Sequence, residues 1–190
     1  MQLVYQEALL MIPNHDNRYE FHRTVTDHIY GGKHREQKLN ITYTTTIHPQ
    51  TNEYVICRIR GSRFPDEAKA KSKSFDMEER QYHFKVNLCL RKITKKGDNE
   101  HYEGTAQPEE YEEFVARKLR LCGIELDQLI HTSEAQSHQI ILKKHKTQCK
   151  SSTFEFLATV TDAEKAAMAY LQGIGSRRNF GFGMLEVIGE

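Results

Sequence analysis

Hydrophobic residues recur along the chain with two different periods, and the change between them separates strands from helices. Residues 2–12 (QLVYQEALLMI) form an apolar run that predicts a first strand. A helix is expected over residues 17–30, because Asn17 with Glu20 three positions later resembles a capping box and Gly31 would stop the helix. Its apolar stripe has helical spacing and should face a sheet; the stripe consists of Phe21, Val25, His28 and Ile29.

Strand patterns dominate the rest of the first half. Residues 39–47 and 54–60 are β-branched runs separated by a polar turn around Pro49, which predicts a hairpin. Residues 82–93 (YHFKVNLCLRKI) predict a strong strand. The segment 62–80 is polar and rich in Lys and Glu, and we expect a loop or a poor helix there.

The second half begins with Pro108, which suits the first position of a helix that Gly123 would end. Thr161 and Glu164 form a capping box for a later helix. The elements expected in this half are a helix over 108–122, strands over 138–145 and 153–160 with a turn over 146–151, a helix over 163–171 and a closing strand over 181–188.

This order of elements predicts an α+β fold of two tandem ferredoxin-like βαββαβ domains, the plan that RNA-recognition (RRM-like) domains also use. We place the N-terminal domain, with the helix over 17–30, at residues 1–95. The C-terminal domain, with a basic hairpin and a glycine-rich segment, follows at residues 96–190. The tandem plan needs a fourth and a fifth strand in the middle of the chain, but one strong strand, at 82–93, is predicted there. The assignment of these two strand positions therefore stays open.

The charge of the chain is close to neutral but unevenly distributed. Over 190 residues the formal net charge is +1, which by itself does not indicate a nucleic-acid binder. Acids gather in 98–113, and lysines gather in two places, at 69–73 and in a basic hairpin. The lysines of this hairpin are Lys143, Lys144, Lys146 and Lys150. Such asymmetry allows a polyanion to bind one side of the protein.

Other classes of protein fit the sequence poorly. The first residues lack the basic start and small-residue cleavage site of a signal peptide, and no apolar stretch reaches the roughly 20 residues that span a bilayer. The four cysteines contain no CxxC pair, so we expect reduced thiols, a cytoplasmic location, no membrane and no metal site or other cofactor.

A glycine-rich segment at 173–183 (GIGSRRNFGFG) follows the last predicted helix. Dinucleotide-binding and P-loop motifs need the reverse order, strand before loop before helix, and GK[ST] is missing. Glycines let backbone N–H groups approach a phosphate, and Arg177 and Arg178 add forked donors. The alternative is an ordinary helix-to-strand loop whose glycines only permit positive φ. The four glycines concerned are Gly173, Gly175, Gly181 and Gly183.

The run GIGSRRNFGFGML resembles the C-terminal signature of CRISPR repeat-processing endoribonucleases, which mature crRNA by cutting precursor repeats. The segment YEFHRTV resembles the Tyr-x-x-His helix of the short members in Cascade type I-E systems. ARKLRLCGIELDQL and TFEFLATVTD occur in the family's order and approximate spacing, whereas residues 31–105 match by strand order only. The resemblance implies two ferredoxin-like domains, a CRISPR repeat stem-loop as ligand and other Cascade subunits as partners.

The resemblance also implies site residues. His22 would be the general acid or base and Tyr19 its companion in a metal-independent cleavage by 2′-OH attack, which leaves 2′,3′-cyclic phosphate and 5′-OH ends. Histidine suits both proton transfers because its ordinary pKa is about 6.5. Arg23 lies on the same helix face. RNA phosphates would meet Arg23, the four lysines of the basic hairpin, and the glycines and arginines of the glycine-rich segment. The product would stay bound.

Alternatives remain open for residues and function. His22 lies at the edge of the apolar stripe and can be a packing residue, while His28 lies on the stripe and is expected to be buried. The lysines of the basic hairpin can be a solvated tip. A protein of the same fold can be a non-catalytic repeat-binding subunit of an interference complex. A third possibility is an unrelated ferredoxin-like protein whose glycine-rich segment holds a small phosphate compound.

Overall fold

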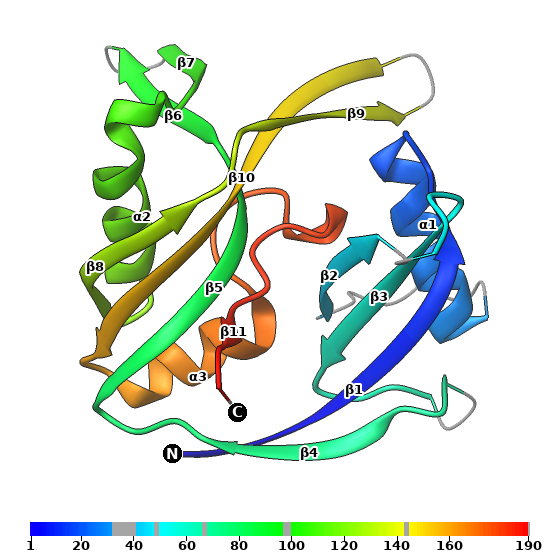
Figure 1. The fold of residues 1–190 in the computed structure, drawn as a ribbon, viewed down its shortest axis with the longest axis horizontal. Coiled ribbons are helices and arrows are strands. Elements are labelled where there is room, and N and C mark those ends of the chain that lie inside the picture. Colours follow the sequence, from blue (N-terminus) through cyan, green and yellow to red (C-terminus); the bar gives the residue numbers. More distant parts are fainter. Residues whose placement is uncertain (32–40, 48–49, 66–67, 97–99, 143–144, 190) are drawn as a thin grey trace.

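The computed structural model describes residues 1–31, 41–47, 50–65, 68–96, 100–142 and 145–189. Two antiparallel sheets stand side by side (Figure 1). The first has the order β2-β3-β1-β4, and its elements are β1 (Gln2–Pro13), α1 (Arg18–Tyr30), β2 (Ile41–Ile47), β3 (Tyr54–Gly61) and β4 (Lys71–Asp76). The second has the order β11-β5-β10-β8, with β9 paired to β10; its strands are β5 (Gln81–Cys89), β8 (Ile124–Thr132), β9 (Gln136–Leu142), β10 (His145–Val160) and β11 (Glu186–Val187).

Shorter elements complete the second half. A two-stranded ribbon projects beyond the end of β5 and consists of β6 (Arg91–Lys96) and β7 (Glu100–Thr105). The helices are the 3-10 turn η3 (Pro108–Glu110), α2 (Tyr111–Arg120), α3 (Ala163–Gln172) and the 3-10 turn η4 (Arg178–Phe180). None of the described helices is long and apolar enough to cross a bilayer.

Both main sheets have the ferredoxin-like strand order, in which the first strand lies between the third and the fourth. The predicted α+β fold of two tandem ferredoxin-like units is therefore confirmed. The first unit departs from the ideal pattern, because the connection from β3 to β4 contains no α-helix in its described residues 62–65 and 68–70.

The helix expected over 17–30 forms as α1, whereas two expectations about the middle of the chain need correction. β4 lies inside the segment 62–80, for which we expected a loop or poor helix; it is an edge strand with Phe75 as its one buried side chain. β5 pairs with β10 and so belongs to the second sheet. The sheets therefore divide between Asp76 and Gln81, rather than at the expected boundary of 95/96.

The second half also differs in detail. Residues 146–151, expected as a turn, lie within β10, where they pair continuously with β9. β8 was not predicted, because register shifts against β10 break the alternation of its buried positions. The closing strand expected over 181–188 is reduced to Glu186–Val187, because Gly181 and Gly183 have positive φ angles of 84° and 82°.

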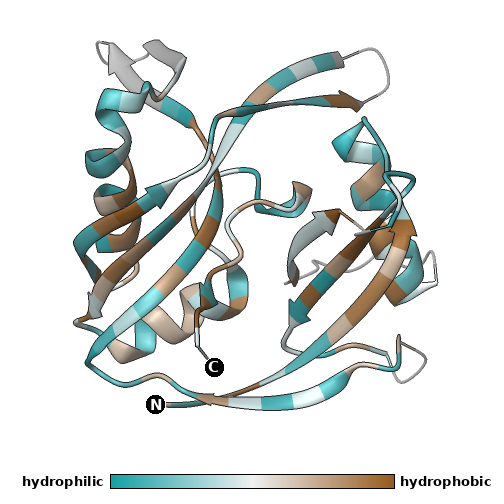
Figure 2. Ribbon diagram, viewed as in Figure 1, coloured by the Kyte–Doolittle hydropathy of each residue, from teal (hydrophilic) through white to brown (hydrophobic). Residues whose placement is uncertain are grey.

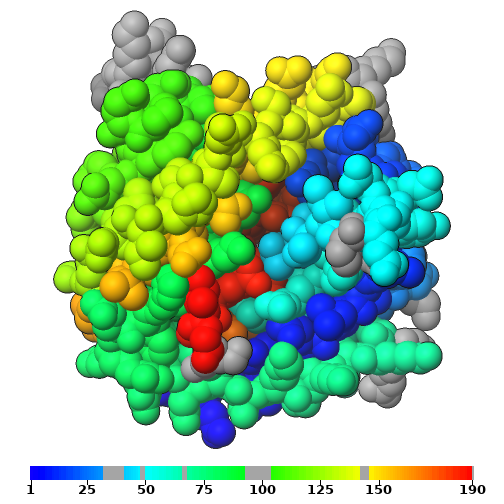
Figure 3. Space-filling model, viewed as in Figure 1, coloured from blue at the N-terminus to red at the C-terminus, as the bar shows by residue number. Residues whose placement is uncertain are grey.

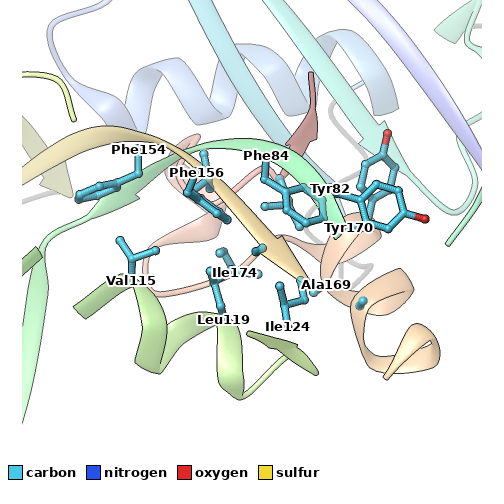
Figure 4. Close-up of a cluster of buried hydrophobic side chains, with 14 of the residues drawn as sticks. Tyr82, Phe84, Val115, Leu119, Ile124, Phe154, Phe156, Ala169, Tyr170 and Ile174 are labelled. Atoms are coloured by element: carbon cyan, nitrogen blue, oxygen red, sulfur yellow. The ribbon is translucent and has the colours of Figure 1, made fainter. Parts of the chain in front are cut away.

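Two hydrophobic clusters hold the sheets. In the first, Phe21, Val25 and Ile29 of α1 pack on the inner face of the first sheet. The larger cluster lies between the second sheet and helices α2 and α3, where Phe84, Phe154 and Phe156 face Val115 and Leu119 (Figure 4). Polar and apolar residues alternate along β5, as Figure 2 shows. The face of β5 that points away from α2 and α3 is therefore polar.

Arg60 joins the two units. It lies on β3 with 2% of its surface exposed, and its Nη1 donates to the carbonyl oxygens of Tyr170 (2.8 Å) and Leu185 (2.9 Å) from the second unit. Its guanidinium also lies 3.7 Å from the ring centroid of Tyr170, and Glu7 is 3.9 Å away. Burial lowers the pKa of Arg60, and these partners compensate for its desolvation. The joint fixes the first sheet relative to α3.

Candidate active site

The N-terminus of α1 is tied to the basic hairpin by Asn17. Its Oδ1 accepts a hydrogen bond from the Tyr19 amide, which caps the helix (3.1 Å). The same side chain accepts from the amide of Ile141 on β9 (2.9 Å) and donates to the Ile141 carbonyl oxygen (3.1 Å). One amide group thus fixes the helix start and its distance from the hairpin.

Arg18 and His138 form a second link between α1 and β9. The Arg18 guanidinium donates to His138 Nδ1 at 3.3–3.4 Å and lies 5.6 Å from the ring centroid of Phe182. Because Nδ1 accepts, His138 Nε2 donates to Ser151 Oγ (2.8 Å). Burial, with the Arg18 charge, lowers the pKa of His138 to about 4, so this imidazole is neutral near neutral pH.

His22 lies where α1 meets the glycine-rich segment. Its half-buried ring stacks on Tyr43 of β2, with centroids 6.3 Å apart, and meets the ring of Phe180 edge-on at 5.9 Å. Tyr43 in turn donates to the Asn179 carbonyl oxygen (3.1 Å). Burial raises the pKa of Tyr43 well above its ordinary value, so its hydroxyl stays protonated. The structure therefore places the imidazole of the first helix against residues 179–180 of the C-terminal segment.

The other predicted residues of α1 have different surroundings. Tyr19 is half-buried one turn before His22. Arg23 is exposed and pairs with Glu20 at 2.9 Å, so Glu20 does not complete the expected capping box. His28 was expected to be buried, but it is exposed and its Nδ1 lies 2.9 Å from the Thr24 carbonyl oxygen.

The glycine-rich segment is a packed turn whose glycines allow close approach. The amides of Gly173, Gly181 and Gly183 already donate to carbonyl oxygens of the protein. A Cβ on Gly183 would stand 2.0 Å from a backbone oxygen, and one on Gly181 would stand 2.6 Å from the Tyr43 ring. Gly175 is exposed. The open cradle of glycine amides that the sequence suggested is therefore absent at these three positions, and the exposed part of the segment is its middle.

The two arginines of that segment take different directions. Exposed Arg178 donates to the carbonyl oxygens of Gln172 and Gly173, so it closes the end of α3. Arg177 is half-buried in the left-handed conformation (φ 58°) and lines a cavity of 170 Å³ with Arg91 and Lys150. No acid lines this cavity among the described residues. We call it the cationic cavity, because three positive charges face a space large enough for a phosphate.

The basic hairpin is described in part. Lys146 and Lys150 are exposed on β10, whereas Lys143 and Lys144 lie outside the described residues. Within the described chain, no three His, Cys, Asp or Glu side chains are arranged to hold a metal ion.

A cleft separates the two sheets on the face seen in Figure 3. It has a volume of 610 Å³ and is lined by Arg18, Thr44 of β2, and Lys85 and Asn87 of β5, among others. Polar residues predominate because the outward positions of β5 and β10 face it. His22 does not line this cleft, so the cleft and the His22 contact are separate features of the same helix.

Sequence reasoning missed several residues of the site. Asn17 was noted only as a helix cap, and its second role depends on a partner 124 positions away. Arg18, Tyr43 and His138 were not singled out, because nothing local distinguishes them from ordinary helix and strand residues. Arg91 was counted as part of a strand; its position beside Arg177 follows from the tertiary fold.

Comparisons with known proteins complete the description. The model of a family described as CRISPR associated protein matches residues 12–188. No curated protein matches the sequence. The structure is similar to that of CRISPR endoribonuclease Cse3 bound to 19 nt RNA, with a TM-score of 0.72 and 16% identity, over 97% of this chain and 99% of that one.

Two further solved structures are similar over nearly their whole length. Thermus thermophilus Cse3 bound to an RNA representing a pre-cleavage complex has a TM-score of 0.72 and 17% identity, over 97% of this chain and 98% of that one. The CRISPR-associated protein Cas6e from Escherichia coli has a TM-score of 0.66 and 15% identity, with the same coverage. At these identities the similarity shows the fold.

Proposed function

Since the chain belongs to the family of CRISPR associated proteins, we propose that it is an endoribonuclease that binds the stem-loop of a CRISPR repeat and cuts the precursor RNA. Membership agrees with the resemblance carried by the glycine-rich segment and the first helix. Proteins of the same fold are named as endoribonucleases bound to RNA, and one similar structure is a CRISPR RNA-guided surveillance complex. Repeat RNA and subunits of such a complex are accordingly the partners that we propose.

The contact between His22 and the glycine-rich segment is the observation that carries this proposal. Cleavage by 2′-OH attack needs a proton taken from the ribose, a proton given to the leaving 5′-oxygen, and stabilisation of charge on phosphorus. We assign the proton transfer to His22 and the orientation of the reacting ribose to Tyr19, one turn earlier on α1. The products would be a 2′,3′-cyclic phosphate and a 5′-OH, formed without a metal ion.

Basic groups near this contact would hold the RNA backbone. Arg177 and Lys150 line the cationic cavity, and exposed Lys146 lies four positions before Lys150 on β10. Phosphate contacts of this kind fix the position of an RNA stem without reading its sequence. Tight retention of the cleaved product would give a single turnover.

A non-catalytic repeat-binding subunit is the second candidate, and one observation favours it. The ring of His22 stacks face to face on Tyr43, as a structural aromatic residue would. In this case the imidazole would only shape the surface that binds RNA.

Cleavage of the cognate repeat RNA in EDTA separates the two candidates. We expect His22→Ala to abolish cleavage while RNA affinity, measured by filter binding, stays within about threefold of wild type. His28→Ala is the matched control, since His28 lies on the same helix and is exposed. Wild-type protein that binds the repeat without cutting it would establish the subunit, and full activity of His22→Ala would remove His22 from the chemistry.

A further inference from the structure

Two of the four free cysteines meet beside the cationic cavity. Cys89, the last residue of β5, pairs in register with Ser151 of β10. Cys149 precedes Ser151 by two positions, so both thiols project from the same face of the sheet as diagonal neighbours. The side chain of Cys149 is the main influence that lowers the pKa of Cys89, which agrees with this placement.

The pair can be reached through the cationic cavity. Cys89 is 2% exposed, but half-buried Cys149 lines the cavity together with Arg91, Lys150 and Arg177. These three cations favour the approach of an anionic small molecule and stabilise a thiolate.

Charge at the pair suits thiol exchange. The hydrogen bond from Cys149 and the charge of Arg177 lower the pKa of Cys89 to about 6, against the opposing effect of burial. The same hydrogen bond, with burial, raises the pKa of Cys149. The pair therefore carries one shared negative charge near neutral pH, and thiolate is the form that attacks disulfides.

We propose that Cys89 and Cys149 form a reversible disulfide when an anionic small-molecule disulfide such as oxidised glutathione reaches half-buried Cys149 beside the cationic cavity. In the first step Cys149 passes its proton to the sulfur of Cys89, and its Sγ, now a thiolate, attacks the incoming disulfide and expels one small thiolate. After the remaining proton is lost, the Sγ of Cys89 attacks Cys149 and expels the second small thiol. Two protein thiols and one disulfide thus give one protein disulfide and two small thiols, and a reducing thiol reverses the reaction.

The modification would act on Arg177. In the reduced protein an anionic sulfur lies near this guanidinium and competes with RNA phosphate for it. A disulfide carries no charge, so oxidation frees the positive charge of Arg177. This consequence rests on the proposed function, and we expect RNA affinity to rise about two- to fivefold on oxidation, as one partly exposed charge contact allows.

Mass spectrometry of the full-length protein tests the disulfide without RNA. After incubation with oxidised glutathione, wild type and the control Cys122→Ser should lose two hydrogens, with peptides of Cys89 and Cys149 linked. Cys89→Ser should instead keep one glutathionyl group on Cys149, because the second thiol is missing. An unmodified wild type, a stable glutathionyl adduct on wild type, or a bridge to Cys122 would overturn the proposal.

Fluorescence anisotropy with labelled repeat RNA tests the link to Arg177. Oxidised wild type should bind more tightly than reduced wild type, and the difference should disappear in Arg177→Gln. Equal affinities of the two redox forms would refute the coupling. Failure of both forms to bind RNA would count against the proposed function, while the mass measurement would still decide on the thiol pair.

Discussion

Substitution of Arg60 by Met tests whether one buried guanidinium holds the two sheets together. Met retains most of the side-chain length but removes the charge and both donated hydrogen bonds. The carbonyl oxygens of Tyr170 and Leu185 would then be buried without this donor. Glu7, 9% exposed, would keep its ion pair with Lys73 and lose the one with Arg60, the two that it makes within the described residues. Loss of one partner from such a buried charged group costs about 3–5 kcal/mol. A domain with about 5–15 kcal/mol of total stability would lose a large share of it.

Urea denaturation followed by far-UV circular dichroism measures this loss, since the chain contains no tryptophan for fluorescence. Arg58→Met is the matched control, because Arg58 lies on the same strand and makes an exposed ion pair with Glu186. Exposed pairs contribute about 1 kcal/mol or less. Equal destabilisation by the two substitutions would refute the reasoning that Arg60 is the joint. Arg60→Met with Glu7→Leu should recover part of the loss, because the buried carboxylate is removed as well.

Three further predictions concern single residues of the site. Gly183→Ala should destabilise the protein by about 2–4 kcal/mol in thermal unfolding, because the new Cβ would stand 2.0 Å from a carbonyl oxygen. Gly189→Ala is the control: its Cβ meets nothing within 4 Å, and the substitution should cost less than half as much. The pKa of His138 is lowered from 6.5 to about 4, so the unfolded chain binds the proton first as pH drops through this window. Because the imidazole is partly exposed to solvent, we expect a loss of about 1–2 kcal/mol of stability. His138→Gln should make the stability measured by denaturation at each pH depend less on pH. Asn17→Ser retains a helix cap but loses both hydrogen bonds to Ile141, which should cost about 1–2 kcal/mol of stability. Hydrogen exchange of the Ile141 amide should then become faster; an unchanged rate would show that Asn17 does not hold β9 to α1.

Local signals determined how much of the fold could be predicted. α1 was correctly placed because Asn17 caps it and Gly31 ends it with φ 58°, both of which depend on neighbouring residues. β4 and β8 escaped prediction because an edge strand and a strand with register shifts show little alternation of apolar residues. The turn at 146–151 was misplaced because its lysines and serines resemble loop residues, whereas pairing with β9 keeps them extended.

The residues of the candidate site were proposed from the sequence, whereas the contacts around them come from the structure. His22 and the glycine-rich segment are far apart in sequence, and the contact with Phe180 depends on Tyr43 filling the space that Gly181 leaves. Burial of the histidines was assigned in the wrong order, since His28 is exposed while His22 is half-buried. The helical stripe alone does not show which edge of a helix a second unit will cover.

β10 continues without interruption for 16 residues, from the core of the second sheet to the hairpin that rests on α1. One end of this strand is anchored among the phenylalanines of the core, and the other end pairs with β9, which Asn17 holds against α1. An even-numbered insertion in both arms of the hairpin would lengthen the hairpin and leave every side chain on its original face, whereas an odd-numbered one would invert them. Related proteins can therefore differ in the length of RNA that they contact, in steps of two residues per strand, while the rest of the fold stays the same.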